Sequence, residues 1–456
     1  MKNINFKIFS ITSIFALLLI SSACDTEDLE PTLAQDKSVE GAITKVDNLY
    51  GILKGALNRV TSSGYWGREM IALNEVRSDN MFSNGNSGRY TTQGEFNYNE
   101  NTGGIWDNCY GVIALANVII QTDLTSLEGD TDYGDHIKGS AHFLRALAHY
   151  DLLRTYGQQH AGGTLGVPIV TTFKGDDLFP PRSSVNEVKD AIMQDLATAF
   201  TLMDTQFDDK VFVSKFAAPA LASRVAIYFG DMQAARDNAA SVINSGLYSI
   251  MPADGYVASF ATSKNPNSIF ELAFSQTDNL SSNALGYIYR TQADGSGYGD
   301  LQVMSAVENL FESGDVRADI LGYQGSILRN MKKYPDMNGW DNIPIIRYEE
   351  VVLNYAEGLL SSDAAAATTQ LNSIQTARGA STTAATIENI MLERRKELMF
   401  EGHRWDDLMR SSSDIIYHGT LENVLGTLTY PNNKFAYPVP ADELNANSNV
   451  TQNTGY

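Results

Sequence analysis

The stretch "APALASRVAIYFGDMQAARDNAASVINSGLY" (Ala218–Tyr248) decides the fold. Small residues recur one helical turn apart in its first half, at Ala218, Ala222 and Ala226. A turn at Gly230 follows, and then a second run of alanines begins. Alanine lets two helices approach closely, and the turn sends the second helix back along the first. The pattern is typical of a tetratricopeptide-like helix hairpin.

The same pattern returns more loosely in "RYEEVVLNYAEGLLSSDAAAATTQLNSIQTARG" (Arg347–Gly379). Apolar residues at helical spacing predict further helices over 39–60, 103–122 and 135–156. Another helix begins near Ser183 or Ser184, where Glu187 can complete a capping box, and runs to about 203. The sequence therefore predicts a mainly α protein, a helical body with two to four tetratricopeptide-like pairs. An ordinary helical bundle remains the alternative.

The composition changes between about 250 and 344, where Gly, Ser, Asn and Tyr become frequent. "SIFELAF" (Ser268–Phe274) alternates like a short strand. Long loops without a function are uncommon, so we expect a loop-rich, ligand-facing insert with minor β-structure here.

The N-terminal segment is typical of a secretory signal peptide over residues 1–23. A basic start precedes a short apolar run at 9–20, which ends in small residues. Cys24 follows directly and begins a polar stretch. We expect lipidation of Cys24, with 24–38 as a tether and 39–456 as a single domain. Ordinary signal-peptide cleavage and free secretion are the alternative.

Charge and cysteine usage narrow the class of protein. The 54 acidic residues outnumber the 33 basic ones, for a net charge of −21, which argues against nucleic acid as a partner. Cys109 is the only other cysteine and lies in an apolar helical stretch, so we expect it to be buried. The six histidines lack metal-binding spacing, and no phosphate loop or serine nucleophile motif is present. No metal or cofactor is predicted.

The most highly charged stretch is "ERRKELMFEGHRWDDLMR" (Glu393–Arg410). Glu393, Glu397 and Glu401 would share one helix face. Pairing with the arginines and lysine between them would lower their pKa, whereas a general acid needs a raised pKa. We therefore expect a salt-bridged structural clamp rather than a catalytic pair, and no enzyme activity.

Five segments resemble the SusD/RagB family of outer-membrane nutrient-binding lipoproteins, and they occur along the chain in the same order as in that family. They are "LERRKELMFEGHRWDDLMR", "IKGSAHFLRALAHYDLLRTYG" with the later "GVPIV", the two helix hairpins, and the terminal "YPVPADELNANSNVTQNTGY". Thr454 replaces the proline usual in the last of these. The resemblance implies non-enzymatic nutrient capture on the outer membrane, facing the exterior, and delivery to a SusC-like TonB-dependent barrel. The nutrient would be an oligosaccharide or polysaccharide. A peptide, as in the RagB branch, is the alternative, and a surface scaffold made of repeats is the second alternative.

Stacking aromatic residues and polar groups in loops are the candidate ligand contacts, because sugar rings present apolar faces and hydroxyls. Two of the four tryptophans, Trp106 and Trp405, fall in expected core helices. The candidates are Tyr65, Trp66, Phe82, Asn84, Tyr287, Tyr289, Arg290, Tyr298 and Trp340. Carbohydrate contacts vary among members of the family, so the resemblance itself assigns none of them.

Overall fold

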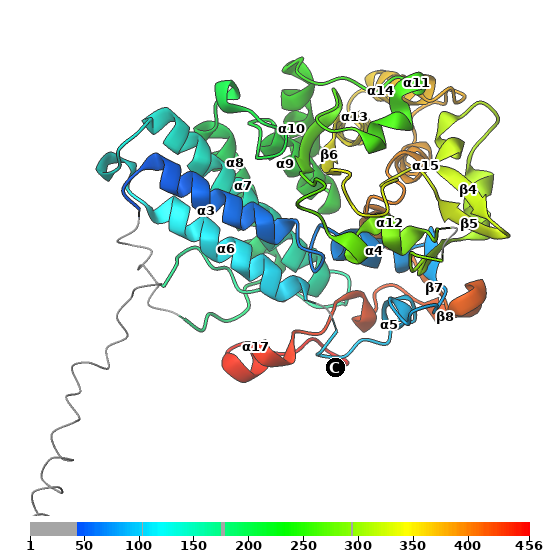
Figure 1. Cartoon of the computed structure of the whole chain (residues 1–456), viewed down its shortest axis with the longest axis horizontal. Helices are drawn as coiled ribbons and strands as arrows, with labels where there is room; N and C mark the ends of the chain where they lie inside the picture. The colour runs from blue at the N-terminus through cyan, green and yellow to red at the C-terminus, as the bar shows by residue number, and fades with distance from the viewer. Residues whose placement is uncertain (1–42, 103, 175–177, 293–294) are drawn as a thin grey trace, which may run out of the picture. The chain divides into compact units, whose positions relative to one another are not determined.

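The computed structural model describes residues 43–102, 104–174, 178–292 and 295–456, and it is mainly helical (Figure 1). The predicted signal peptide, the lipidated cysteine and the tether lie outside the described residues. The longer helices are α3 (Val46–Val60), α6 (Ile105–Gln121), α7 (Thr131–Tyr156), α8 (Val185–Leu202), α9 (Ala217–Tyr228), α10 (Met232–Asn244), α13 (Tyr348–Leu359), α14 (Ala364–Ala377) and α15 (Ile387–Glu397). The shorter ones are α4 (Glu69–Val76), α5 (Thr91–Gly94), α11 (Ala253–Tyr256), α12 (Leu285–Tyr289), α16 (Arg404–Arg410) and α17 (Ala441–Ala446).

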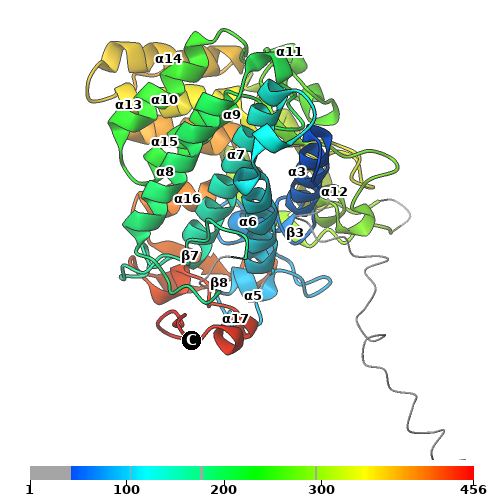
Figure 2. The ribbon, with the colours of Figure 1, turned by 90° about the vertical axis from the view of Figure 1, so that its left-hand side faces the viewer.

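Helices that follow one another in the chain pack as pairs within the unit formed by residues 45–456. Helix α7 packs against both α6 and α8, α9 packs against α10, and α13 packs against α14. The two predicted hairpins are therefore confirmed as helix pairs. In Figure 2 the pairs α9–α10 and α13–α14 lie near one end of this unit, and α17 lies at the other end.

Local capping explains where several helices begin. Ser184 accepts from the Glu187 backbone N–H at 3.3 Å, and the Glu187 carboxylate accepts from the Ser184 N–H at 2.8 Å, which confirms the capping box. Helix α7 begins earlier than predicted because Asp130 caps it. Helix α3 begins at Val46, because Lys45 is extended, and the first part of the helix predicted over 39–60 lies outside the described residues.

The strands form four separate antiparallel pairs. They are β1 (Met81–Ser83) with β3 (Leu301–Val303), β2 (Ser268–Leu272) with β6 (Ile343–Arg347), β4 (Leu321–Gln324) with β5 (Ile327–Asn330), and β7 (Ile415–His418) with β8 (Val424–Leu428). The strand predicted in "SIFELAF" is confirmed as β2. The expected loop-rich insert thus contains β2 to β5 as well as α11 and α12, and β1 fastens it to the N-terminal half of the chain.

The charged segment is buried and paired, as expected for a structural clamp. Arg317 donates to Glu393 at 2.5 Å, Arg378 donates to Glu397 at 2.9 Å, and Lys333 lies 2.5 Å from Glu401. The expected pairing of these three glutamates with the cations of the segment itself is wrong, because their partners come from three other parts of the chain. The arginines of the segment pair with aspartates instead: Arg394 with Asp407 of the same segment, and Arg395 and Arg404 with Asp79.

The three glutamates also do not share one helix. Helix α15 ends at Glu397, and Phe400 then adopts a left-handed backbone with a φ of 66°. Glu401 lies in the turn that follows, and Arg347 joins it to Glu397 with N–O distances of 2.8 and 3.1 Å. Trp106, Trp405 and Cys109 are buried in the core, as predicted.

Candidate functional site

Five of the nine predicted ligand contacts are buried side chains: Tyr65, Trp66, Phe82, Tyr289 and Arg290. The turn before α4 folds inward onto α7. There the Tyr65 hydroxyl and the Trp66 indole N–H both donate to Asp151 Oδ2, at 2.6 and 2.7 Å. The expectation that a loop position would expose these two rings is wrong, because the buried carboxylate of Asp151 requires donors.

Arg290 also has a structural position. Its guanidinium donates to the backbone carbonyls of Asn330, Lys333 and Tyr334. Burial lowers its pKa to about 10, so it remains charged at neutral pH. Phe82 lies inside β1 and Tyr289 ends α12, both with 2% exposure or less. None of these three side chains can reach a ligand at the surface.

Three other predicted residues, Asn84, Tyr287 and Tyr298, are brought together at the surface. The pairing of Ser83 with Leu301 places the chain that leaves β1 beside the chain that enters β3. Asn84 Nδ2 donates to the carbonyl of Gly299 at 2.7 Å. Asn86 Nδ2 donates in the same way to the carbonyl of Tyr298, also at 2.7 Å.

Two half-buried tyrosine rings form the centre of this surface. The rings of Tyr287 and Tyr298 meet edge to face, with centroids 4.9 Å apart. The Arg89 guanidinium lies 4.0 Å above the Tyr298 ring, in cation–π geometry. We call the surface formed by Asn84, Asn86, Arg89, Tyr287 and Tyr298 the tyrosine–arginine face.

A buried carboxylate lies beneath the tyrosine–arginine face. Asp300 is fully buried, and its Oδ1 accepts from the Ser87 backbone N–H at 3.1 Å. Its Oδ2 accepts no hydrogen bond among the described residues and lies 3.8 Å from Arg89 Nη1. Arg89 donates one hydrogen bond in the described part of the chain, to Ser87 Oγ at 3.3 Å. Most of its N–H groups therefore remain available to a ligand.

Gly299 allows the close packing under this face. Its φ is +52°, a conformation that other residues rarely adopt, and an added Cβ would lie 2.9 Å from the Arg329 guanidinium. Arg329 Nη1 donates to the Gly299 carbonyl at 2.6 Å. The backbone that carries Tyr298 is thus fixed by contacts on its buried side.

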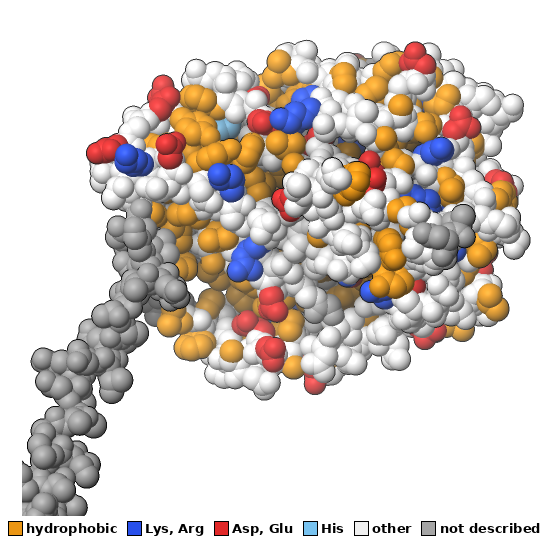
Figure 3. Space-filling view, in the orientation of Figure 1, with side chains coloured by type: hydrophobic (Ala, Val, Ile, Leu, Met, Phe, Trp, Pro, Cys, Tyr) orange, Lys and Arg blue, Asp and Glu red, His pale blue; other side chains and the backbone are white. Residues whose placement is uncertain are grey.

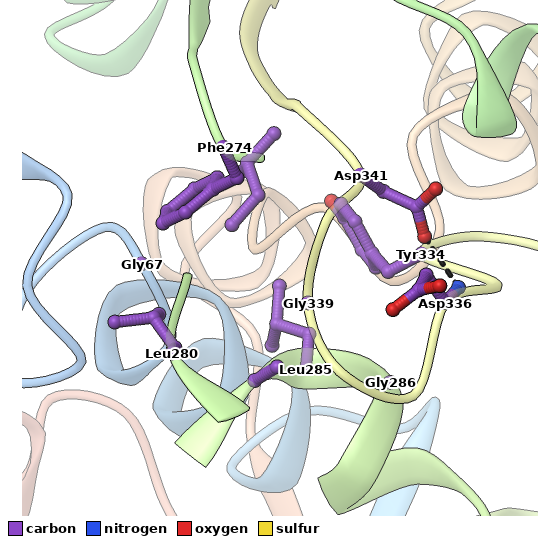
Figure 4. Close-up of a pocket in the computed structure, with 11 residues that line it drawn as sticks. Gly67, Phe274, Leu280, Leu285, Gly286, Tyr334, Asp336, Gly339 and Asp341 are labelled. Atoms are coloured by element: carbon purple, nitrogen blue, oxygen red, sulfur yellow. Dashed lines mark hydrogen bonds between the residues drawn. The ribbon is translucent and has the colours of Figure 1, made fainter. Parts of the chain in front are cut away.

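Trp340 is the one predicted aromatic that is clearly exposed, at 39% of its surface. Its loop packs tightly on the start of α12, since a Cβ at Gly339 would lie 2.4 Å from the Cβ of Ala284. The pocket under this loop is drawn in Figure 4, where Phe274 and Tyr334 point into it. Its volume of about 10 Å³ suits one water molecule and is far too small for a sugar ring. Trp340 can therefore act only from the outer side of its loop.

On the side shown in Figure 3, acidic and basic side chains are scattered and form no extended basic patch. Among the described residues, no group of three or more His, Cys, Asp or Glu side chains is arranged to hold a metal ion. None of the helices in the described ranges is both long enough and apolar enough to span a membrane.

Asn86, Ser87, Arg89 and Asp300 are not among the candidate ligand contacts named from the sequence. The available signal was the run of small polar residues in "SNGNSGRY" (Ser83–Tyr90), which leaves β1 as a tight surface loop. That run could not show which part of the insert faces it, because the β1–β3 pairing joins residues more than 200 positions apart.

The fold and the face define a class: a mainly helical protein built on paired helices, with a preformed polar and aromatic surface between strand loops. Residues 28–227 match the SusD-like family described as "Starch-binding associating with outer membrane", and residues 322–456 match the SusD family. The chain belongs to the SusD/RagB family.

Individual relatives agree with this assignment. SusD-like protein P38 of Formosa agariphila is 30% identical over 261 residues, which are 55% of this chain and 47% of that protein. The chain thus spans about half the length of the curated relatives it matches. A SusD superfamily structure from Bacteroides vulgatus is 28% identical, with a TM-score of 0.82 over 91% of this chain and 100% of that one. Another Bacteroides vulgatus structure, named for sugar binding, is 27% identical, with a TM-score of 0.81 over 91% and 99%.

Proposed function

We propose that the protein captures an oligosaccharide or polysaccharide through the tyrosine–arginine face, without chemical change. The observation that carries the proposal is the half-buried pair Tyr287–Tyr298 under Arg89. Apolar faces of sugar rings stack on such rings, while guanidinium and amide groups bind the hydroxyls. The similarity to a structure named for sugar binding supports the same ligand class.

We further propose that the chain is anchored to the outside of the outer membrane by lipid on Cys24, with residues 1–23 removed as a signal peptide. Residues 24–38 would be the tether and residues 39–456 a single domain. The partner would be a SusC-like TonB-dependent barrel that receives the ligand. Support comes from the motifs in the sequence and from a family description that mentions association with the outer membrane.

The buried carboxylates support a binding role rather than catalysis. Burial on its own raises the pKa of Glu397, but Arg378, Arg347 and Arg317 outweigh it and hold the pKa below the usual glutamate value. A carboxylate held ionised in this way cannot serve as a general acid. Glu397 is also fully buried, away from any ligand.

Isothermal calorimetry of the protein lacking residues 1–24 tests the proposed ligand. Panels of neutral oligosaccharides and of peptides would be titrated into the wild type and into Tyr298→Ala. Loss of one stacking ring is expected to weaken saccharide binding about tenfold or more. Tyr50→Ala is the matched control, because Tyr50 is also half-buried under a cation, with Lys54 Nζ at 4.7 Å from its ring centroid, but lies on α3.

The outcomes separate the alternatives. Saccharide binding that Tyr298→Ala weakens and Tyr50→Ala does not supports the proposal. Binding of peptides alone would favour peptide uptake, and no heat from either panel with the wild type would contradict saccharide capture. A Trp340→Ala variant shows whether the platform extends to that loop.

A further inference from the structure

The hairpin formed by β7 and β8 exposes an unusual number of aliphatic side chains. Eleven large hydrophobic side chains are exposed among the described residues, and four of them lie on this hairpin. They are Ile416, Leu421, Val424 and Leu425, with exposures of 55, 81, 65 and 50%. Exposed aliphatic side chains that are gathered in one place, rather than scattered singly, are typical of an interaction surface. We call these four residues the hairpin patch.

The tip of the hairpin is held in one conformation. Leu421 and Glu422 both adopt left-handed backbone geometry, with φ of 61° and 60°, which is unfavourable for residues with side chains. The Glu422 carboxylate accepts from the backbone N–H and the hydroxyl of Ser305, at 3.0 and 2.9 Å. These bonds fix the turn that leaves Leu421 exposed, and strain of this kind is common at functional positions.

A groove of about 400 Å³ runs beside the hairpin patch. Its apolar lining includes Met304, Leu408, Ile415, Ile416 and Val424. Three carboxylates and one guanidinium also line it: Asp79, Asp414, Glu422 and Arg395. Asp79 is paired with both Arg395 and Arg404, at 3.0 and 2.7 Å, whereas Asp414 and Glu422 form no ion pair within the described part of the chain. The groove therefore has an excess of negative charge next to apolar surface.

The hairpin tip borders the tyrosine–arginine face. A Cβ added at Gly85 would lie 2.6 Å from Cγ2 of Thr420, so the tip touches the loop that carries Asn84 and Asn86. A partner bound to the hairpin patch would therefore lie next to a saccharide bound to the tyrosine–arginine face.

Charge decides among the possible occupants. A second copy of the chain would bring the same acidic groove and another net charge of −21. The stretch "DTEDLE" (Asp25–Glu30) of this chain is acidic as well. An anionic membrane surface would be repelled for the same reason. A protein surface with basic residues next to apolar ones satisfies both features of the groove.

We propose that the hairpin patch and its groove dock a protein partner that presents apolar side chains flanked by Lys or Arg. The partner's identity rests on the proposed function, in which a TonB-dependent barrel receives the ligand. Docking at this hairpin would place the barrel next to the bound saccharide and so shorten the path of transfer.

Site-specific photo-crosslinking in cells tests the docking surface. A photoreactive amino acid would replace Leu421 in the full-length chain, and cross-linked proteins would be identified by mass spectrometry. Leu247 is the matched control, because it is an aliphatic residue with 52% exposure outside the hairpin. We expect a cross-link to a TonB-dependent barrel from position 421 and not from position 247. The cross-linked segment of the partner should contain Lys or Arg.

The other outcomes overturn the proposal in distinguishable ways. Cross-links at 421 to a second copy, to lipid only, or to no protein would exclude the proposed occupant. A barrel that co-purifies with the wild type but cross-links at 247 alone would leave the proposed function intact and refute only the surface. As a second measurement, the double variant Leu421→Ser, Val424→Ser should reduce co-purification of the barrel about tenfold. Saccharide affinity by calorimetry should stay unchanged, because neither side chain belongs to the tyrosine–arginine face.

Discussion

Two regions of this molecule combine arginines with other polar side chains, and they differ in how completely these groups are paired. In the buried charge network, formed by Glu393, Glu397 and Glu401 with Arg317, Lys333, Arg347 and Arg378, every carboxylate has a cationic partner within 3.1 Å. In the tyrosine–arginine face, Arg89 lies 3.8 Å from its nearest carboxylate oxygen and keeps unused donors.

The degree of pairing distinguishes structural charged groups from ligand-binding ones better than the density of charged residues does. A fully paired, buried network has no capacity left for a ligand, and its geometry is set by neighbours on all sides. A half-buried guanidinium over an aromatic ring is held in place but retains donors toward solvent. The longest charged run in the sequence therefore marks the scaffold, while the binding surface is formed by small polar residues and two tyrosines.

The largest expected effect is on stability, from breaking the buried charge network. Glu397→Ala would remove one of the two carboxylates that the buried Arg347 and Arg378 share, the other being Glu349. Removing one partner of a buried ion pair lowers the free energy of unfolding by about 3–5 kcal/mol. Urea unfolding followed by circular dichroism would measure the change.

An exposed pair supplies the control for that experiment. Glu128 lies 3.6 Å from Lys45, and their side chains are 79% and 59% exposed. Glu128→Ala should change the free energy of unfolding by no more than about 1 kcal/mol. Equal losses in the two variants would mean that the network contributes nothing beyond surface pairing.

A second prediction concerns a tryptophan that the sequence placed in the binding site. Trp66→Phe removes the indole donor to the buried Asp151, which costs about 1–3 kcal/mol of stability. Saccharide affinity should not change, because Trp66 is only 1% exposed. Trp340→Phe, the same substitution at an exposed position, should alter stability by less than about 0.5 kcal/mol. A loss of saccharide affinity in Trp66→Phe with unchanged stability would instead indicate that Trp66 contacts the ligand.

The outcome for Trp66 shows where sequence reasoning reaches its limit. Helix pairs follow from spacing within one segment, so the hairpins at 218–248 and 347–379 could be predicted locally. The burial of Trp66 depends on Asp151, which lies on another helix and is 85 positions away. The assembly of Asn84 with Tyr298 depends on a strand pairing between the two halves of the chain. Composition indicated which types of residue would form the site. The tertiary structure was needed to show which of these residues lie together at the surface.

A third prediction uses acid to probe the buried network. Burial raises the pKa of Glu401, but Arg347 and Lys333 outweigh it, so the pKa lies below the ordinary value of 4.5. The folded carboxylate then stays ionised while the unfolded one takes up a proton. The stabilisation is complete above pH 4.5 and is lost as pH falls through the folded pKa. One such group contributes a slope of at most about 1.4 kcal/mol per pH unit.

The variant Glu401→Gln isolates this contribution. Its free energy of unfolding should fall less steeply with acid below pH 4.5 than that of the wild type, whatever its stability at neutral pH. Urea unfolding at several pH values between 3 and 6 measures both slopes. Parallel curves would show that Glu401 has an ordinary pKa and that the network does not hold it ionised.

The smallest expected effect belongs to the tyrosine–arginine face and tests what Arg89 contributes there. Arg89→Lys keeps the positive charge near Asp300 but loses the planar group that lies 4.0 Å above Tyr298. Stacking and cation–π contacts at exposed sites are worth about 0.5–1 kcal/mol, so saccharide affinity by calorimetry should fall only about two- to fivefold. Arg89→Gln also removes the positive charge. Its affinity for a neutral saccharide should be at most about fivefold lower than that of the wild type. A far larger loss in Arg89→Gln than in Arg89→Lys would mean that the ligand carries negative charge, because only then does the charge itself decide binding rather than the shape and donors of the guanidinium.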